Sequence, residues 1–483
     1  MEPRYQPLCA SEECAEGIGG EEQPMSTNFV NGTAPRALPL VGHAIPLMRR
    51  PVEFLDSLPA YGDLVEIRLG PTRAYVPCHP ELLRQVLMED RVFDKGGPLF
   101  DRLRDIVGNG LGSCPHRDHR RQRRLLQPAF HRARLQHYAD VMEQESTVLT
   151  ESWQEGQVID AFPVLYGFAL RTATRTLFTA HVDDGDVETI QRSFETALGG
   201  LFQRMFLPRA WQRLPLPANR RYQQALDHLH GRVDRIIADY RRGGQNHGDL
   251  LSMLMSARDE DGGATLNDDE VHDQVITMLF GGSETVAANL TWTLYLMSRH
   301  PEAARKVHEE TDAVLEGRPA GWSDLPELPF TNRMITESLR LYPPAWLYTR
   351  ITASQVELAG RRLEPGTTLV ISPPVVHRQA SVHADPTDFS PDRWLPDRTA
   401  DLPRGSFATF GAGARKCIGD AYALAEATLA LATIANRWQV ECDPGTDVRP
   451  STLATVMHPR RLHLRLARRT TKTARHNARR GPS

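Results

Sequence analysis

The sequence predicts a mainly α-helical fold with small β-sheets, an α+β arrangement in a single domain. Three observations predict it. One apolar pattern of helical period runs from residue 267 to 301, about 33 residues or roughly 50 Å, long enough to cross a whole domain. Short strand-like runs stand apart from one another among longer helical patterns. Between residues 35 and 466, no repeat or low-complexity linker divides the chain.

Composition is consistent with one large core and excludes several classes of protein. The chain has 483 residues, 40% hydrophobic and 24% charged, and its net charge of −3 indicates no nucleic-acid partner. Its six cysteines lack paired spacing, which favours a reducing compartment over a disulfide framework. No apolar run reaches the roughly 18 residues of a membrane span, and the start does not resemble a secretory signal. We expect a cytoplasmic monomer without a membrane span.

The two ends of the chain differ from the middle. Residues 1–34 are rich in Glu, Gly, Ser and Asn without a hydrophobic period, so we expect a disordered extension. Met25 offers an alternative translation start to Met1. Residues 467–483 are basic and poor in apolar side chains. We expect a disordered, solvated tail there; an arm that binds nucleic acid or a membrane is the alternative.

The individual elements follow from local patterns. Strands are expected within residues 63–70, 73–78, 354–360, 367–373 and 461–466. The long helix should begin at Asn267, because Glu270 three residues later completes a capping-box pattern.

The stretch FGAGARKCIG, residues 410–419, places one cysteine at the start of a predicted helix. Its glycines allow the backbone to approach a flat or bulky group closely. The helix N-terminus should lower the pKa of the Cys417 thiol. A nucleophile needs a histidine base, and none lies nearby in sequence; a zinc site needs further Cys or His ligands. An axial thiolate for haem iron fits, and a buried structural cysteine is the alternative.

This stretch resembles the cysteine-ligand loop of the cytochromes P450, whose pattern is Phe-x-x-Gly-x-x-x-Cys-x-Gly. Phe410, Gly413, Cys417 and Gly419 fill its fixed places. The resemblance implies a haem b whose iron is bound by Cys417, with Phe410 packed on the sulfur side. It also places Arg415 where a cation binds a haem propionate.

Other family marks occur in the same order along the chain. Glu337 and Arg340 lie three apart on one predicted helix face, and Arg393 follows in FSPDRW. In P450s these residues form a buried charge network that supports the cysteine loop.

Basic residues elsewhere match propionate-binding places of the family. His119 and Arg123 lie four apart in HRRQRRLLQPAF, and Arg350 lies in LYTRITASQ. Taken separately, each could equally be a solvated surface charge. With Arg415, they occupy four such places, so the resemblance implies a shared role in holding haem.

The long helix carries the pattern that implies oxygen chemistry. Gly281, Gly282, Ser283, Glu284 and Thr285 match the family's Ala/Gly-Gly-x-Asp/Glu-Thr. Paired glycines are costly within a helix, and a kink that opens a groove over the haem would account for them. The resemblance implies that Thr285 hydrogen-bonds the bound oxygen or an ordered water, that Glu284 relays protons, and that Gly282 shapes the groove. A Thr285 hydroxyl that bonds back to the i−4 carbonyl is the structural alternative.

The implied activity is a monooxygenase that inserts one atom of O₂ into a hydrophobic small molecule. No flavin or iron–sulfur segment is fused to the chain, so electrons should come from a separate ferredoxin and its reductase. A non-catalytic haem-thiolate sensor would not need Glu284 and Thr285. A peroxygenase usually replaces this pair.

Several stretches, including FDKGGPLFDRLR and GRPAGWSDLPELPFT, resemble actinomycete P450s of terpenoid metabolism. The substrate could therefore be a terpenoid, with a polyketide or a fatty acid as alternatives. Family positions predict an apolar pocket lined by Phe93, Leu99 to Leu103, Phe202, Phe206, Leu279, Phe280, Ala345 to Leu347 and Val456.

Arginines on the helix beginning near residue 116 suggest where the electron carrier docks. Arg120 and Arg124 share a face that should point away from the haem, and Lys416 should lie on the same side. They would form a positive patch for an acidic ferredoxin; a solvated basic helix face is the alternative.

Overall fold

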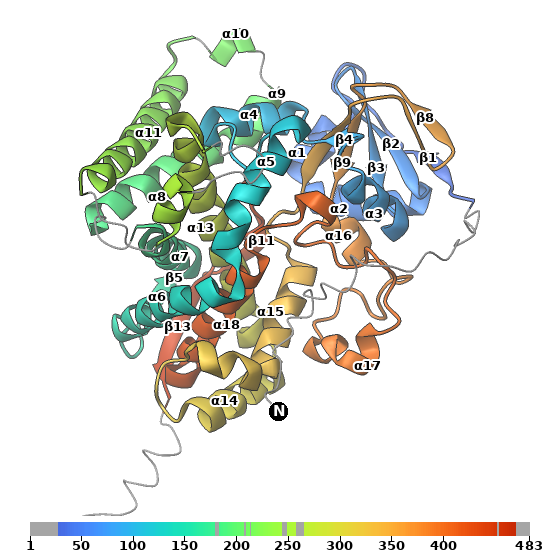
Figure 1. The fold of residues 1–483 in the computed structure, drawn as a ribbon. Helices are drawn as coiled ribbons and strands as arrows, with labels where there is room; N and C mark the ends of the chain where they lie inside the picture. The colour runs from blue at the N-terminus through green and yellow to red at the C-terminus, as the bar shows by residue number, and fades with distance from the viewer. Residues whose placement is uncertain are drawn as a thin grey trace, which may run out of the picture.

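The computed structural model describes residues 28–178, 183–206, 209–212, 214–243, 249–256, 265–451 and 454–469. Helices fill most of the molecule, and the largest sheet lies to one side of them (Figure 1). The predicted mainly helical fold with small sheets is confirmed.

The α-helices in chain order are α1 (Ala44–Arg49), α2 (Pro51–Ser57), α3 (Pro80–Met88), α4 (Pro98–Val107), α5 (His116–Leu126), α6 (Arg132–Glu151), α7 (Ala161–Leu177), α8 (Asp184–Gly199), α9 (Leu201–Phe206), α10 (Arg209–Gln212), α11 (Pro217–Gly243), α12 (Leu250–Ser256), α13 (Asp268–Arg299), α14 (Pro301–Leu315), α15 (Pro329–Leu341), α16 (Pro373–His377), α17 (Pro396–Thr399) and α18 (Asp420–Arg437). Short 3₁₀ helices are η2 (Leu58–Tyr61), η3 (Gln127–Phe130), η4 (Trp322–Glu327), η5 (Pro391–Trp394) and η6 (Gly413–Arg415).

The largest sheet has the strand order β1-β2-β3-β9-β6-β4. Its strands are β1 (Asn31–Thr33), β2 (Leu64–Leu69), β3 (Thr72–Pro77), β9 (Thr368–Ile371), β6 (Tyr348–Thr352) and β4 (Phe93–Asp94). A second sheet joins β10 (Trp438–Cys442), β13 (His463–Arg468) and β5 (Val158–Asp160). Two antiparallel pairs complete the set, β11 (Asp447–Pro450) with β12 (Pro459–Arg461) and β7 (Val356–Leu358) with β8 (Arg361–Leu363). Each run expected to be a strand overlaps one, although β3 begins before residue 73 and β13 ends after residue 466.

Both expected domain boundaries leave out residues that belong to the fold. At the start, β1 pairs in parallel with β2, with Asn31 opposite Leu64, and the Val30 N–H donates to Asp63. At the end, β13 continues to Arg468, and Arg469 donates to Asp312 at 2.9 Å. The ordered domain therefore extends beyond 35–466 at both ends. The rest of the expected tails, 1–27 and 470–483, lies outside the described residues.

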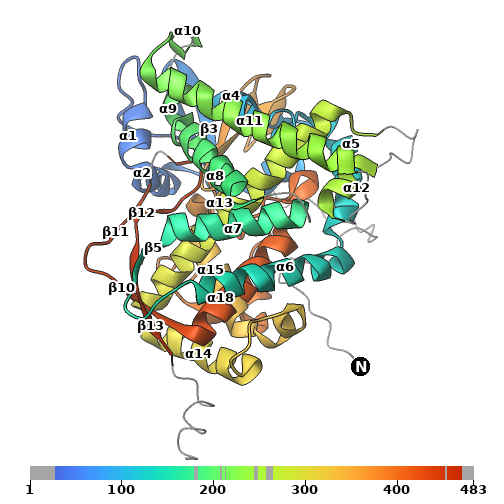
Figure 2. The ribbon, with the colours of Figure 1, turned by 90° about the vertical axis from the view of Figure 1, so that its left-hand side faces the viewer.

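Helix α13 runs through the middle of the molecule (Figure 2). The predicted start is confirmed, because the Asn267 side chain accepts from the Glu270 N–H while Glu270 accepts from the Asn267 N–H. The helix packs against α7, α15 and α18. Its apolar side chains join the largest buried cluster, which is why a long helix is stable at the centre of the fold. One face of α13 instead borders a cavity.

Candidate active site

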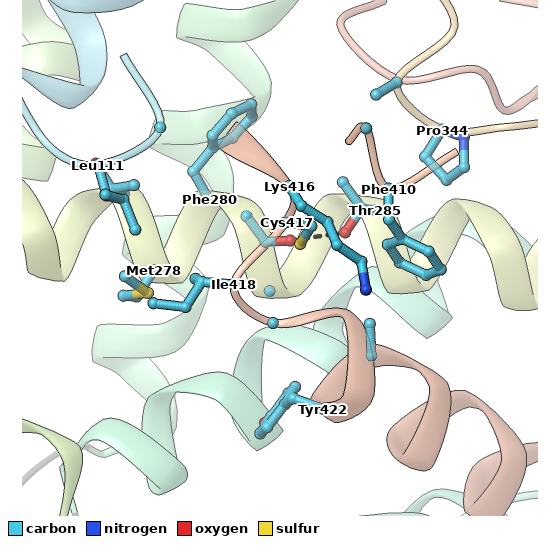
Figure 3. A pocket seen from close by; sticks show the side chains of 18 of the residues that line it. Leu111, Met278, Phe280, Thr285, Pro344, Phe410, Lys416, Cys417, Ile418 and Tyr422 are labelled. Carbon is cyan, nitrogen blue, oxygen red and sulfur yellow. Dashed lines mark hydrogen bonds between the residues drawn. The ribbon is translucent and has the colours of Figure 1, made fainter. Parts of the chain in front are cut away.

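A cavity of about 420 Å³ lies between α13 and the loop that precedes α18. Figure 3 shows Phe410, Lys416, Cys417 and Ile418 following one another along this loop, in front of α13. Other walls come from α4, α5, α7 and the segment leading into β6. Residues far apart in sequence thus meet around one space inside the molecule.

Cys417 borders this cavity with its sulfur accessible from inside it. The loop is held by its own backbone, because the Cys417 N–H donates to the Phe410 carbonyl at 2.8 Å. Gly413 has a φ of 64°, and a Cβ there would come within 3.0 Å of the Leu87 carbonyl oxygen. A side chain at this position would therefore strain the turn and push it away from α3.

The ionisation of Cys417 is controlled by opposing influences. Burial among protein atoms raises the pKa of the thiol, and the Asp420 carboxylate acts in the same direction. The Gly419 N–H, Arg123 and Lys416 lower that pKa. The N–H at the helix start thus lowers the thiol pKa as expected, but burial outweighs it and the pKa is raised overall. A cationic group bound to the sulfur would reverse this balance by stabilising the thiolate.

Thr285 and the paired glycines form the α13 wall of the cavity. Gly281, Gly282 and Thr285 all border it. A Cβ at Gly281 would meet no atom within 4 Å, whereas one at Gly282 would touch the Ala173 side chain of α7 at 3.5 Å. The Thr285 Oγ1 donates to the Gly281 carbonyl at 2.6 Å, so the structural alternative for this hydroxyl is observed. Because its proton is engaged there, the oxygen offers lone pairs for other partners.

Glu284 lies beside Thr285 but does not border the cavity. Its side chain is 6% exposed, and burial raises the pKa of the carboxyl to about 7. The Thr455 hydroxyl donates to Glu284 Oε2 at 3.0 Å, which lowers that pKa in part. This acid can therefore carry a proton near neutral pH while it stays out of bulk water.

Cationic side chains gather at one end of the cavity. The predicted residues His119, Arg123, Arg350 and Arg415 all border it, and Lys95 joins them. Burial together with Arg350 and Arg415 lowers the pKa of Lys95 to about 7. Burial and the cations Arg415, Lys95 and Arg123 lower the pKa of His119 to about 3. So much positive charge in one buried place favours an anionic partner.

The partners of these cations differ. Arg350 is 4% exposed, and its Nε and Nη1 have no hydrogen-bond partner among the described residues. Arg415 is paired, donating to Asp90 at 3.1 Å and to Asp94 at 2.7 Å. Arg123 ties α5 to the cysteine loop through the Lys416 carbonyl. Arg350 is thus the cation with the clearest unmet hydrogen-bonding capacity.

Glu337 is the centre of a buried ionic network behind the cysteine loop. Arg340 donates to both of its carboxylate oxygens, at 2.8 and 2.9 Å, and Arg393 approaches Glu337 Oε1 at 3.4 Å. The Trp394 indole, which the sequence analysis missed, adds a fourth contact at 2.8 Å. Arg340 also donates to the His377 carbonyl, and the His377 ring accepts from the Ala408 N–H at 3.0 Å. The network thereby fixes the start of the cysteine loop.

The apolar lining corresponds only in part to the sequence expectation. Leu99, Phe100, Leu103, Phe280, Ala345 and Leu347 border the cavity. Four other expected residues do not border the cavity and are buried elsewhere: Phe93, Leu279, Trp346 and Val456. The reason is that a shift of one residue along an element turns the side chain to another face. The side chains of Phe202 and Phe206 lie outside the described residues. The expectation missed Lys95, Leu111, Met278 and Thr455, whose local sequence carries no distinct signal.

The residues around the cavity suit a flat, largely apolar group that carries carboxylates and a metal. The sulfur of Cys417 faces the cavity and can bind a metal, and Gly281 leaves room for a planar group. The Nε and Nη1 donors of Arg350, which have no partner among the described residues, can bind a carboxylate. A cytochrome P450 sequence model matches residues 33–466. The chain belongs to the cytochrome P450 family.

Three Streptomyces proteins are similar in sequence to this chain over most of its length. Pentalenene oxygenase of Streptomyces avermitilis is 58% identical over 442 residues, which cover 92% of this chain and 98% of that protein. Cyclooctatin synthase of Streptomyces melanosporofaciens is 46% identical, covering 89% and 94%. Cyclooctat-9-en-7-ol 5-monooxygenase of the same organism is 45% identical, covering 89% and 93%.

This P450 is a monooxygenase whose cofactor is haem, with the Cys417 thiolate as the axial iron ligand. Its substrate is hydrophobic, and it uses O₂ and electrons from redox partners. Within the described part of the chain, no helix combines the length and hydrophobicity that crossing a bilayer requires.

Proposed function

We propose that this P450 oxidises a terpenoid of bacterial secondary metabolism. The observation that carries the proposal is the apolar part of the cavity wall, where aliphatic and aromatic side chains predominate: Leu99, Phe100, Leu103, Leu111, Met278, Phe280 and Leu347. Such a wall binds a compact hydrocarbon by burial and leaves its polar groups few partners. The relatives named for terpenoid products support the choice. A polyketide or a fatty acid is the second candidate.

The proposed roles of the site residues follow from their positions. Haem bound through Cys417 supplies the activation of O₂, which thiolate donation favours. Arg350, His119, Arg123, Arg415 and Lys95 hold its propionates. Phe410 shields the sulfur side and, with Gly413 and Gly419, shapes the loop.

On the opposite wall, Gly281 and Gly282 give room near Thr285, whose hydroxyl oxygen accepts a hydrogen bond from an ordered water. Glu284 stores a proton on its carboxyl and replaces the proton that Thr285 or its water gives up. An acid–alcohol pair of this kind favours a monooxygenase over a sensor without catalysis.

We also propose that electrons come from a ferredoxin. Arg120 and Arg124 are exposed on α5, and Arg123 of the same helix contacts the cysteine loop, so α5 lies on the sulfur side of the cavity. Lys416 contributes less than the sequence suggested, because it forms an ion pair with Asp420 at 2.7 Å. A monomeric state and a cytoplasmic location remain predictions.

Substrate binding and turnover together test this proposal. The haem-loaded protein would be titrated with terpene hydrocarbons and alcohols, fatty acids and polyketide lactones, following the substrate-induced shift of the haem spectrum. Terpenoids should bind most tightly and yield an oxygenated product that carries ¹⁸O from ¹⁸O₂, only when ferredoxin and its reductase are present. Tighter binding and turnover of a fatty acid or lactone would replace the terpenoid assignment. Binding without product would favour a sensor.

A further inference from the structure

The turn between β11 and β12 brings a threonine to the cavity from near the end of the chain. The Trp292 indole of α13 donates to the Met457 carbonyl at 2.8 Å, and the Met457 N–H donates to the Pro344 carbonyl at 3.0 Å. These bonds tie the turn to α13 and to the segment that follows α15. Val456 points into the protein, and Thr455 borders the cavity instead.

Thr455 connects the cavity to the buried acid of α13. Its Oγ1 donates to Glu284 Oε2 at 3.0 Å. Thr455 is among the residues that border the cavity, whereas Glu284 is not. A molecule in the cavity can therefore contact Thr455 directly. It reaches Glu284 only by way of the Thr455 hydroxyl or by moving beyond that side chain.

The hydrogen bond from Thr455 determines the orientation of the Glu284 carboxyl, because few other polar groups among the described residues surround it. Besides the Thr455 hydroxyl, Glu195 of α8 acts on the Glu284 carboxyl and disfavours its ionised form. Glu284 in turn raises the pKa of Tyr166 of α7. A buried carboxyl with few polar neighbours takes its orientation from the hydrogen bonds it has. Because Oε2 accepts from Thr455, and a carbonyl oxygen is the better acceptor, the acid proton is directed to Oε1.

We propose that Thr455 is a positioning residue that holds the Glu284 carboxyl at the cavity wall and directs its proton to Oε1, and so sets the efficiency of proton delivery. The proposal deepens the proposed function, because it assumes that Glu284 supplies protons during oxygen activation. It assigns a role to a residue outside the α13 pattern, contributed by the opposite end of the chain.

Infrared spectroscopy of the resting, haem-loaded protein tests the hydrogen bond without turnover. The carbonyl band of the protonated Glu284 would be identified in pH-difference spectra by its loss in Glu284→Gln. In Thr455→Val, which keeps the shape but removes the hydroxyl, the band should move to higher frequency, because a carbonyl freed from a hydrogen bond stretches at higher frequency. Thr455→Ser should restore the parent position.

Turnover gives the second readout. Product formed per NADPH consumed, with ferredoxin and its reductase, should fall about fivefold in Thr455→Val, and Thr455→Ser should recover most of it. Melting temperature should change little, and coupling is compared at saturating substrate because Thr455 borders the cavity. Thr446→Val is the matched control, since the Thr446 hydroxyl donates to the His463 carbonyl outside the cavity. That control should leave both the band and the coupling unchanged.

Each outcome decides something specific. An unshifted Glu284 band in Thr455→Val, or a valine variant with parent coupling, overturns the proposal. A shifted band in a protein that forms no product from any terpenoid would leave the positioning of the proton intact and refute the proposed function instead. Equal loss of coupling in the serine and valine variants would mean that the methyl group matters and not the hydroxyl, which also overturns it.

Discussion

Arg350 is the single residue whose surroundings say most about what the cavity holds. Its position in β6, opposite Leu369 of β9, makes its side chain part of a rigid sheet. Burial lowers its pKa, yet no acid of the described chain pairs with it and two of its nitrogens lack partners. An unpaired buried cation costs several kcal/mol, so we propose the anionic group of the cofactor as its partner.

Replacing Arg350 with Leu should weaken haem binding. We expect at least about a tenfold faster transfer of haem to apomyoglobin, corresponding to the loss of one charge-assisted hydrogen bond of roughly 1.5–3 kcal/mol. Arg362→Leu, at an exposed arginine in β8 of a separate strand pair, is the control and should leave the rate unchanged. Parent retention of haem in Arg350→Leu would show that this residue does not hold a propionate.

Cys417→Ala should abolish the absorption band of the reduced, CO-bound haem that thiolate ligation produces. The reason is that Cys417 is the described cysteine whose sulfur faces the cavity. Cys442→Ala, in β10, should keep the band in full. Persistence of the band without Cys417 would refute the assignment of the ligand.

Thr285→Ala should lower the product formed per electron while haem content and substrate affinity persist. The reduction should be about tenfold, which is less than the roughly 100-fold or more that general acid–base catalysis typically contributes, because water still delivers some protons without the hydroxyl. Thr293→Ala is a matched control, because its hydroxyl bonds back to Asn289 in the same helix but lies outside the cavity. Equal coupling in the Thr285 variant and the parent would leave Thr285 with the structural role alone.

At the scale of elements, the contact between α18 and α7 contains an unusual buried acid. Glu426 is fully buried in α18, and neither carboxyl oxygen accepts a hydrogen bond from the described residues. Thr172 of α7 acts on it, but the Thr172 hydroxyl already donates to the Phe168 carbonyl at 3.0 Å. Burial raises the pKa of Glu426 well above its usual range, so the acid is protonated in the folded protein.

Glu426→Gln should therefore stabilise the protein increasingly as the pH rises. The folded protein keeps the Glu426 proton above pH 4.5 whereas the unfolded chain releases it, so the parent loses stability with increasing pH and the glutamine variant does not. The difference in unfolding free energy should grow by up to about 1.4 kcal/mol per pH unit. Urea denaturation at pH 5, 6, 7 and 8 measures it. Glu441→Gln, exposed in β10, should show no such trend, and a flat difference for Glu426→Gln would contradict a protonated acid.

At the scale of the whole molecule, charge is distributed unevenly although the net charge is only −3. Helix α5 carries Arg117, Arg120 and Arg124 on its exposed face, while Arg121 pairs with Glu270. The same helix reaches the cysteine loop through Arg123. An electron carrier that docks here would come close to the haem on its sulfur side.

Reversing Arg120 and Arg124 to Glu should slow reduction by an acidic ferredoxin at low salt by about tenfold or more, without changing substrate affinity. Added salt should slow the parent more than the variant, because ions screen such attraction over about 10 Å at 0.1 M. Stopped-flow reduction in the presence of CO measures both. The same double reversal at Arg220 and Arg221 of α11, exposed on another helix, serves as the control. Identical rates and salt dependence in parent and variant would place docking elsewhere.

The sequence by itself determined the features that depend on local pattern. The capped start of α13 is local, because Asn267 and Glu270 satisfy each other's backbone groups within one turn. The strand runs are local, because alternation and turn residues delimit them. The cysteine loop is also a local feature, because the spacing of its phenylalanine, glycines and cysteine is enough to indicate the family. These features needed no knowledge of distant contacts.

The tertiary structure alone decided which side chains from distant parts of the chain meet around the cavity. Lys95 borders the cavity because its Nζ donates to the Leu111 and Gly112 carbonyls, and Arg415 donates to Asp90 and Asp94, some 320 residues away. Thr455 reaches Glu284 although 171 residues separate them. Which side chain of a neighbouring pair faces a cavity depends on packing between elements, and a displacement of one residue exchanges Val456 for Thr455. Burial likewise sets the ionisation of Glu284, since desolvation depends on every element that covers it.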